Sequence, residues 1–374
     1  MNEKERLHAT LEGKPVDCLP VTVLYNMLYH NDHFNELTGQ PPWQWAQWLY
    51  SEPEEHLRLF SAIHEKAPFE ILQPHTAPPR EERQNSRFIE KYGQHFRYNV
   101  KFDMYTPLNT LSGHANDYIA NEEQYIVDIK DINDYIAITP AEELIAQGLN
   151  DYAEAIVKAY GKDHFILTGG VIGTIYSCGA YVGQTNTFIL MRENPSLIDY
   201  LCVKITEKNI EQIRRIAAVG GDAIYIDDAT ATNDMISVHD YETFSLPYMK
   251  TMVNEIHRLG HKAILLYYGG IADRLEQIAS IGADGLSMET SMKNYVNDVE
   301  AIVKKIGDRV TVFGNIDPYG VLEKGSDEEL ETEMRRQAQA GRQGRGFVMC
   351  TGSPITVNTS LSRVQLFLEL GKKV

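Results

Sequence analysis

The chain is poor in cationic residues and has no long apolar run. Its 374 residues include 35 Lys and Arg against 52 Asp and Glu, so the formal net charge is −17. A nucleic-acid-binding surface needs Lys and Arg gathered on one face to neutralise phosphates, so this balance argues against a nucleic-acid partner. No uncharged stretch approaches the roughly 20 apolar residues that a membrane span requires, so we expect no membrane partner either.

Cysteine is also scarce, and its spacing excludes a disulfide framework. The four cysteines form no CxxC pair, which is typical of a reducing compartment; they are Cys18, Cys178, Cys202 and Cys350. The N-terminal segment MNEKERLHATLEGK is polar and lacks the apolar core of a signal peptide. With 43% hydrophobic and 23% charged residues, the composition is that of a folded protein rather than a disordered one. We therefore expect an acidic, globular, cytoplasmic protein.

Predicted strands alternate with predicted helices, a pattern typical of βαβ units around a parallel sheet. We expect strands at residues 19–27, 69–72, 165–168, 223–226, 263–267, 285–288, 310–313 and 347–349. We expect helices at 3–13, 43–66, 141–160, 184–192, 196–218, 240–259, 271–281, 295–305, 327–340 and 358–371. Neither G-x-G-x-x-G nor GxxxxGK[ST] occurs, so the glycine pairs at 169–170, 220–221 and 269–270 are expected in loops and caps. The fold class predicted is α/β, a single (β/α)₈ TIM-type barrel.

One segment does not follow the barrel pattern. Between residues 87 and 104, apolar and polar residues alternate around Gly93-Gln94, which predicts an antiparallel β-hairpin with one solvated face. We interpret it as an insertion, spanning about residues 87–126, into a single barrel domain that covers residues 1–374.

In such a barrel, functional side chains collect at the C-terminal ends of the strands. Asp227, Asp228 and Glu289 are the candidate catalytic acids, because a carboxyl pair near a barrel mouth favours a raised pKa. Tyr267 and Tyr268 alternate in direction, so only one of them is expected to point fully into the mouth. The candidate substrate-binding residues are Tyr25, His75, Tyr176, Tyr267, Tyr268, Asn315, Asp317 and Ser353.

Several of these candidates have a structural alternative. Asn315 and Asp317 would also serve to hold their turn by hydrogen bonds, and a lone histidine such as His75 is often structural. Cys350, in the apolar stretch FVMC, is more typical of a buried small side chain than of a metal ligand. Glu289 and Cys350 are therefore only weak metal candidates.

Several segments together resemble the uroporphyrinogen decarboxylase superfamily. Residues 313–318, FGNIDP, are similar to its GN-[LI]-DP motif after strand seven. GRGFVMCTGSPITVNTSLSRVQLFLELG resembles its closing strand, turn and helix, and GADGLSMET resembles strand six. The strand-four region of the family is similar to Asp227-Asp228 and the later segment SVHDYETFSLPYMKTMVNEIHRLGHK. The opening of the family is similar to RLHATLEGKPVDCLPV. The resemblance covers essentially the whole chain and implies the same distorted barrel.

The superfamily contains two chemistries, which the residues distinguish. One is the decarboxylation of uroporphyrinogen, a substrate with eight carboxylates that calls for arginines. Here the stretch after strand one, LPVTVLYNMLYHNDHF, has no Arg or Lys, and Ser353 replaces the histidine of a GHG-type turn. The other chemistry is methyl transfer involving corrinoid proteins, often with a zinc site.

The usual zinc ligands of the methyltransferases are not found at the matching positions. Their H-x-C triplet falls on Leu266-Tyr267-Tyr268 and their late cysteine on Ser353. A zinc site built from other His, Glu or Cys side chains remains an open alternative. A tyrosine-rich pocket suits a flat aromatic ligand.

The resemblance therefore implies a methyltransferase that moves a methyl group from a small, methoxyaromatic donor to a corrinoid protein, with a carboxyl or tyrosine acid. Decarboxylation and ligand binding without turnover remain the alternatives, and a homodimer stays open.

Overall fold

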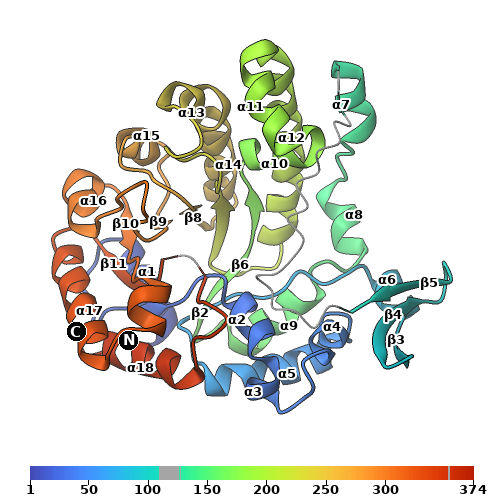
Figure 1. Ribbon diagram of the computed structural model, residues 1–374, viewed down its shortest axis with the longest axis horizontal. Coiled ribbons are helices and arrows are strands. Elements are labelled where there is room, and N and C mark those ends of the chain that lie inside the picture. The colour runs from blue at the N-terminus through green and yellow to red at the C-terminus, as the bar shows by residue number, and fades with distance from the viewer. Residues whose placement is uncertain (109–125, 127, 353) are drawn as a thin grey trace.

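Eight parallel strands form a nearly closed barrel with helices around it (Figure 1). The computed structural model describes residues 1–108, 126, 128–352 and 354–374. The strand order is β1-β11-β10-β9-β8-β7-β6-β2, so the first two strands of the chain lie at the two ends of the sheet. The strands are β1 (Val21–Thr22), β2 (Ile71–Leu72), β6 (Phe165–Ile172), β7 (Ala223–Asp227), β8 (Lys262–Tyr267), β9 (Gly285–Met288), β10 (Thr311–Phe313) and β11 (Phe347–Cys350). The predicted (β/α)₈ barrel is confirmed.

Proline or glycine interrupts some of the predicted helices, and the helices at 26–32, 34–38, 80–85, 129–135 and 174–182 were not predicted. A single helix was expected at 43–66, but Pro53 begins α5 because proline fits only the first turn of a helix. The helix expected at 141–160 is likewise two helices, with Gly148 at a φ of +89° between them. The helices before residue 86 are α1 (Glu3–Leu11), α2 (Asn26–Asp32), α3 (Phe34–Thr38), α4 (Gln44–Trp48), α5 (Pro53–Lys66) and α6 (Arg80–Asn85). The later ones are α7 (Ile129–Tyr135), α8 (Ala141–Ala146), α9 (Asp151–Tyr160), α10 (Thr174–Val182), α11 (Gln184–Glu193), α12 (Pro195–Ala217), α13 (Val238–Phe244), α14 (Leu246–Arg258), α15 (Leu275–Ala279), α16 (Val299–Ile306), η2 (Pro318–Glu323), α17 (Asp327–Gly341) and α18 (Leu361–Gly371).

The apolar core has two layers that the strands separate. A smaller cluster fills the barrel interior, where Leu7 and Leu11 of α1 pack against Phe165, Ile264 and Val348 of the strands. A larger cluster lies between the sheet and the surrounding helices. Because successive side chains of a strand point to opposite faces, the parity of a residue decides whether it faces the interior or the helices.

Strand β1 is shorter than predicted, and this has a consequence for the mouth of the barrel. The strand expected at 19–27 comprises only Val21–Thr22, and the chain then turns into α2. Tyr25 makes this turn with a φ of +54°, in the left-handed region that few non-glycine residues adopt. Its ring packs against the interior cluster.

Strand β6 is longer than predicted, so placing Gly169 and Gly170 in a loop was wrong. Both lie inside β6, with a shift of register between Leu167 and Gly169. A Cβ atom at Gly170 would lie 2.3 Å from Cδ2 of Tyr225 on the neighbouring strand. Glycine is therefore needed here to leave room for the Tyr225 ring.

The predicted hairpin is confirmed and carries a third strand. Strands β3 (Ser86–Lys91), β4 (Gln94–Asn99) and β5 (Met104–Pro107) form an antiparallel sheet that projects from the barrel (Figure 1). The turn between β3 and β4 has positive φ at Tyr92 and Gly93, as two-residue hairpin turns require. One face is anchored through Arg97, which pairs with Glu82, and through His95, which stacks on Trp43 at 4.3 Å. Residues 109–125 and 127 of the expected insertion lie outside the described part of the chain.

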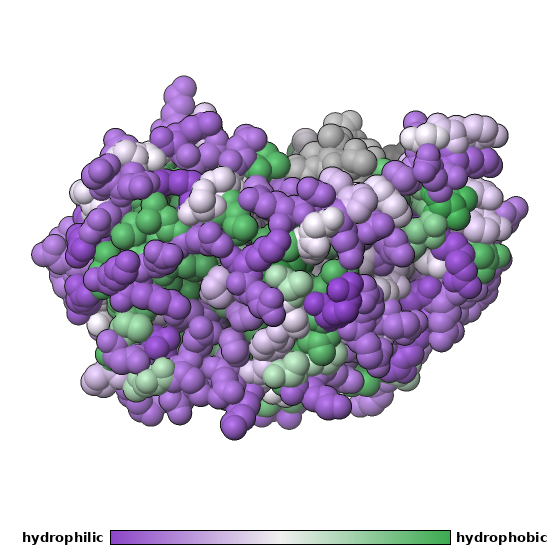
Figure 2. Space-filling view, turned by 90° about the horizontal axis from the view of Figure 1, so that it is seen from below, coloured by the Kyte–Doolittle hydropathy of each residue, from purple (hydrophilic) through white to green (hydrophobic). Residues whose placement is uncertain are grey.

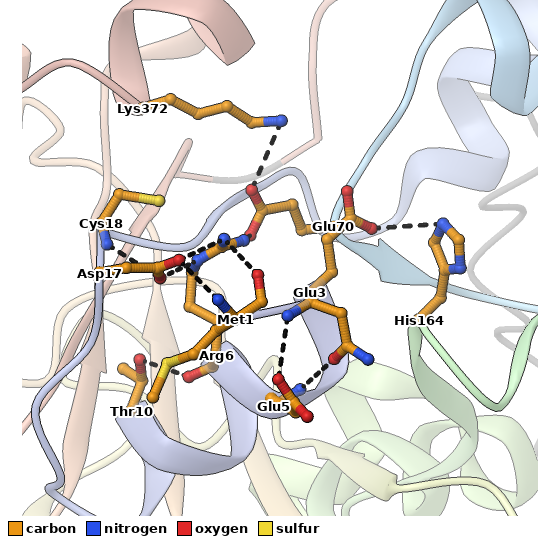
Figure 3. Close-up of polar contacts among 11 residues, drawn as sticks. Met1, Glu3, Glu5, Arg6, Thr10, Asp17, Cys18, Glu70, His164 and Lys372 are labelled. Atoms are coloured by element: carbon orange, nitrogen blue, oxygen red, sulfur yellow. Dashed lines mark hydrogen bonds and ion pairs between the residues drawn. The ribbon is translucent and has the colours of Figure 1, made fainter.

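The N-terminal edge of the barrel is held by an ion-pair cluster (Figure 3). Arg6 lies 2.9 Å from Asp17 and 3.4 Å from Glu70, and Lys372 lies 3.7 Å from Glu70. Burial raises the pKa of Glu70, while the nearby Arg6 lowers it. These contacts tie α1 and the last residues of the chain to β2, on the edge opposite the strand ends where function is expected.

The surface agrees with the composition. Figure 2 shows a face covered mostly by hydrophilic residues, with apolar residues in separate patches. Within the described ranges, no helix combines the length and the apolarity needed to cross a membrane.

Candidate active site

The neighbouring carboxyls Asp227 and Asp228 lie on opposite sides of the sheet. Asp227 ends β7 and accepts a hydrogen bond of 2.6 Å from the hydroxyl of Tyr25, at the interior side of the barrel. Asp228 turns toward the helices, where it accepts a hydrogen bond of 2.5 Å from Ser245 Oγ between α13 and α14. The two predicted acids therefore belong to different environments, because strand residues alternate in direction.

Four tyrosines from four elements surround Asp227. They are Tyr25 before α2, Tyr176 on α10, Tyr225 on β7 and Tyr268 after β8, and each is partly buried. The ring centroid of Tyr25 lies 5.9 Å from that of Tyr225 and 5.4 Å from that of Tyr268, in edge contacts at about 60°. Such tilted pairs are the favoured arrangement of aromatic rings. We call this group, with Asp227, the tyrosine cage.

Burial controls the ionisation of the cage. It raises the pKa of Asp227 to about 6, against smaller opposing effects of the hydrogen bonds from Tyr25 and the backbone of Ala229. Burial and then the charge of Asp227 raise the pKa of Tyr176 and of Tyr225. No Lys, Arg or His is among the described groups that shift the pKa of Asp227. Among the described residues, the cage is therefore a neutral-to-acidic site whose carboxyl no cation is seen to shift, and this carboxyl titrates close to pH 6.

Asp228 is part of a buried polar network behind the sheet. Burial raises its pKa to about 7, with Ser245 lowering it and Asp227 raising it to smaller extents. Nearby, the hydroxyls of Tyr267 and Tyr241 lie 2.8 Å apart. Tyr267 thus packs in the sheet–helix layer while Tyr268 joins the cage, which is the alternation predicted for this pair.

Arg274 links this network to the loop after β7. The side chain is completely buried and donates hydrogen bonds to the carbonyl oxygens of Ala231 and Ile236. Its guanidinium lies 5.2 Å from the ring centroid of Tyr241. Arg274 therefore fixes the loop that follows the two aspartates.

The remaining predicted residues near the mouth have structural contacts. Glu289 follows β9, and its charge acts on Tyr268, which places it beside the cage. Asn315 donates to the carbonyls of Glu289 and Asn297 and accepts a hydrogen bond from Gln337. Asp317 caps η2 by accepting hydrogen bonds from the amides of Tyr319 and Gly320. The contacts of Asn315 and Asp317 are those expected of residues that hold the turn.

The two candidates at the end of β11 differ in what the structure describes. Cys350 is fully buried in the barrel interior, where burial raises the pKa of its thiol to about 12. Ser353 lies outside the described residues. Glu289 and Cys350 were weak metal candidates. Across the residues that the structure describes, no three His, Cys, Asp or Glu side chains are arranged to hold a metal ion.

His75 lies in the layer of α4 and α5. Its ring makes edge contacts with Trp45, Trp48 and His56, and burial lowers its pKa to about 4. Neither ring nitrogen has a hydrogen-bond partner among the described residues. The buried His56 and His30 also have pKa values lowered by burial, to about 2 and about 3. His75 is therefore a neutral core histidine in this structure.

We expect His75→Phe to reduce the acid sensitivity of the fold. An unfolded histidine takes up a proton below pH 6.5, whereas folded His75 does so only near pH 4, so the free energy of unfolding falls as the pH drops through this window. At pH 5 the variant should lose about 2 kcal/mol less than the parent, relative to pH 7.5. Urea unfolding at both values measures this. His239→Phe, at an exposed histidine, is the control, and equal losses in parent and His75→Phe would contradict the prediction.

Some residues of the site were not predicted from the sequence. Tyr225 lies two positions before Asp227 on the same strand, so the alternation of side chains could have indicated it. Ser245 and Arg274 are distant in sequence from the aspartates, and no motif signals their contacts. Only the packing of α13, α14 and α15 on the sheet brings them there.

Comparison with known proteins places this geometry in a family. The family model "Uroporphyrinogen decarboxylase (URO-D)" matches residues 102–374, most of the chain. The chain belongs to the uroporphyrinogen decarboxylase family. It is 26% identical over 277 residues to the uroporphyrinogen decarboxylase of Ruthia magnifica subsp. Calyptogena magnifica, covering 71% of this chain and 70% of that protein. It is 25% identical over 260 residues to that of Prochlorococcus marinus, covering 67% and 71%.

A solved structure has the same fold. The methyltransferase from Methanosarcina mazei superposes with a TM-score of 0.71 at 20% sequence identity, covering 100% of this chain and 99% of that one. The resemblance seen in the sequence motifs is thus confirmed at the level of the superfamily. The family model and the curated relatives name an enzyme, uroporphyrinogen decarboxylase.

Proposed function

We propose that this family member is a methyltransferase that moves a methyl group from a small methoxyaromatic donor to the cobalt of a corrinoid protein. The tyrosine cage is the observation that carries the proposal. Its rings offer π-faces and hydroxyls to a flat, partly polar ligand. Its interior carboxyl, Asp227, has a pKa raised to about 6 and can act as an acid near neutral pH.

The proposed reaction breaks the bond between the methyl carbon and the ether oxygen. The methyl group passes to the reduced cobalt of the carrier, which is a substrate of the reaction, and the oxygen leaves with the bonding electron pair. That oxygen needs a proton, which protonated Asp227 supplies directly or through the Tyr25 hydroxyl that it binds. The products are a phenol and the methylated carrier. We further propose that the reaction takes place in the cytoplasm.

Decarboxylation of a polycarboxylate porphyrinogen is the second candidate, favoured by the curated relatives. Arginine is the natural partner of carboxylates in such a site. The described groups that act on the pKa of Asp227 are the Tyr25 hydroxyl and the backbone of Ala229, with no cation among them. A carboxyl-lined mouth of this kind repels a polyanion, so we place decarboxylation second and ligand binding without turnover third.

Zinc does not fit the described part of the mouth. Cys350, at the end of β11, is fully buried in the barrel interior, and across the described residues no three His, Cys, Asp or Glu side chains are arranged to hold a metal ion. We therefore derive no step through a metal held by this chain.

The decisive experiment supplies the methyl acceptor as a free corrinoid, without the protein that carries it. The purified protein is mixed with free cob(I)alamin and a panel of methoxybenzenes and methoxybenzoates, and methylcobalamin is followed by its absorbance. We expect methylcobalamin from at least one donor, and no carbon dioxide from uroporphyrinogen under the same conditions. Failure of all donors, or release of carbon dioxide, would overturn the proposal.

A further inference from the structure

We propose that the tyrosine cage also binds methylated ammonium cations, as a second class of methyl donor. The part of this inference that makes the cation a donor rests on the proposed methyl transfer, whereas its binding does not. The geometry that carries it is a ring of aromatic side chains around one buried carboxyl.

The arrangement of the rings suits a compact cation. The faces of tyrosine rings carry negative potential and attract cations that approach the ring centroid, and several rings around one space are the known means of binding quaternary ammonium groups. Tyr25 is tilted by 62° against Tyr225 and by 61° against Tyr268. The planes of Tyr225 and Tyr268 are therefore each steeply inclined to that of Tyr25, whose hydroxyl binds the carboxyl of Asp227.

The electrostatics of the cage leave a place for one positive charge. Asp227 is 8% exposed, and its Oδ1 has no hydrogen-bond partner among the described residues. A second carboxyl, Glu289, acts on Tyr268 from the end of β9. A buried carboxylate without a cation is costly, so a methylated ammonium ion would supply the partner that the described residues do not provide.

The two donor classes need opposite protonation states of Asp227. When the bond between a methyl carbon and an ammonium nitrogen breaks, the electron pair stays on nitrogen and a neutral amine leaves, so no proton is required. An ether donor needs the proton. With the pKa of Asp227 near 6, binding of the cation should strengthen as the pH rises through 6, while ether cleavage should weaken. The titratable groups that face Asp227 are Tyr25, Tyr176, Tyr225, Tyr268, Asp228 and, by way of Tyr268, Glu289.

Choline and 3,3-dimethylbutan-1-ol give a matched test, because they have the same shape and differ in the positive charge. Isothermal titration calorimetry at pH 7.5 should show choline binding at least 10-fold more tightly than the neutral alcohol. Asp227→Asn should abolish that preference, and Asp308→Asn, at an exposed carboxyl beyond α16, should keep it. Equal affinities for the two compounds, no binding of either, or an unchanged preference in Asp227→Asn would overturn the inference.

A second measurement separates this inference from the proposed function. Cob(I)alamin is incubated with the protein and tetramethylammonium, and in parallel with the methoxyaromatic panel. Methylation by both donors supports both proposals. A preference for choline without methylation from any donor would overturn the methyl transfer and leave the cation site standing. Methylation by an ether alone, with no preference for choline, would overturn only the cation site.

Discussion

Asp227→Asn lowers the rate of methyl transfer from a methoxyaromatic donor by about 10²- to 10⁴-fold, the usual contribution of a general acid. Asparagine keeps the size of the side chain and can still accept the hydrogen bond from Tyr25, but it carries no transferable proton. Because burial raises the pKa of Asp227 to about 6, the rate of the parent should fall as the pH rises above 6, and the variant should lose this dependence. Stopped-flow absorbance of methylcobalamin across pH 5–8 measures both effects.

Matched carboxyl replacements separate the acid from a general effect of charge. Asp308→Asn removes an exposed carboxyl and should leave the rate unchanged. Glu289→Gln and Asp228→Asn should lower turnover without unfolding the protein, Glu289 from beside the cage and Asp228 from behind the sheet. Asp228→Asn should do so without removing the dependence on pH, because Asp228 contacts Ser245 rather than the interior. A fully active Asp227→Asn variant would remove Asp227 from the mechanism.

Arg274→Ala destabilises the fold by about 3 kcal/mol, the largest loss of stability that we expect from the site region. The variant leaves the carbonyl oxygens of Ala231 and Ile236 buried without their donors and removes the cation above the ring of Tyr241. Replacing a planar fork by a single ammonium cannot restore two such bonds, so Arg274→Lys should recover only part of the loss. Urea unfolding followed by far-UV circular dichroism gives the free energies.

An exposed arginine provides the comparison for Arg274. Arg309 pairs with Glu276 at the surface, and surface ion pairs contribute at most about 1 kcal/mol. Arg309→Ala should therefore change stability far less than Arg274→Ala. If the two variants lost equal stability, the hydrogen bonds from Arg274 to the loop after β7 would contribute no more to the free energy of unfolding than a surface ion pair.

The barrel was predictable because each strand and helix carries its own signal in the sequence. Short strand-like runs such as 223–226 and 285–288 end at polar or turn residues, and the segments between them are long enough for helices. The boundaries were less predictable. Tyr25 adopts a left-handed conformation that a tyrosine rarely takes, so nothing local marks the end of β1. Gly169 and Gly170 were expected in a loop, because the need for space beside Tyr225 arises only from the neighbouring strand.

The sequence determined the family, the barrel and the acidic, tyrosine-rich character of its mouth, because these depend on residue types at the ends of consecutive strands. Only the tertiary structure decided the side of the sheet for each member of the Asp227–Asp228 and Tyr267–Tyr268 pairs. Strand periodicity requires neighbours to diverge but does not say which one faces inward, since that depends on register and packing. The net charge of −17 led us to expect an acidic site. Within the described residues, the structure added how the site is arranged: the carboxyl of Asp227 lies at the interior side, four tyrosines lie around it, and no cation acts on its pKa.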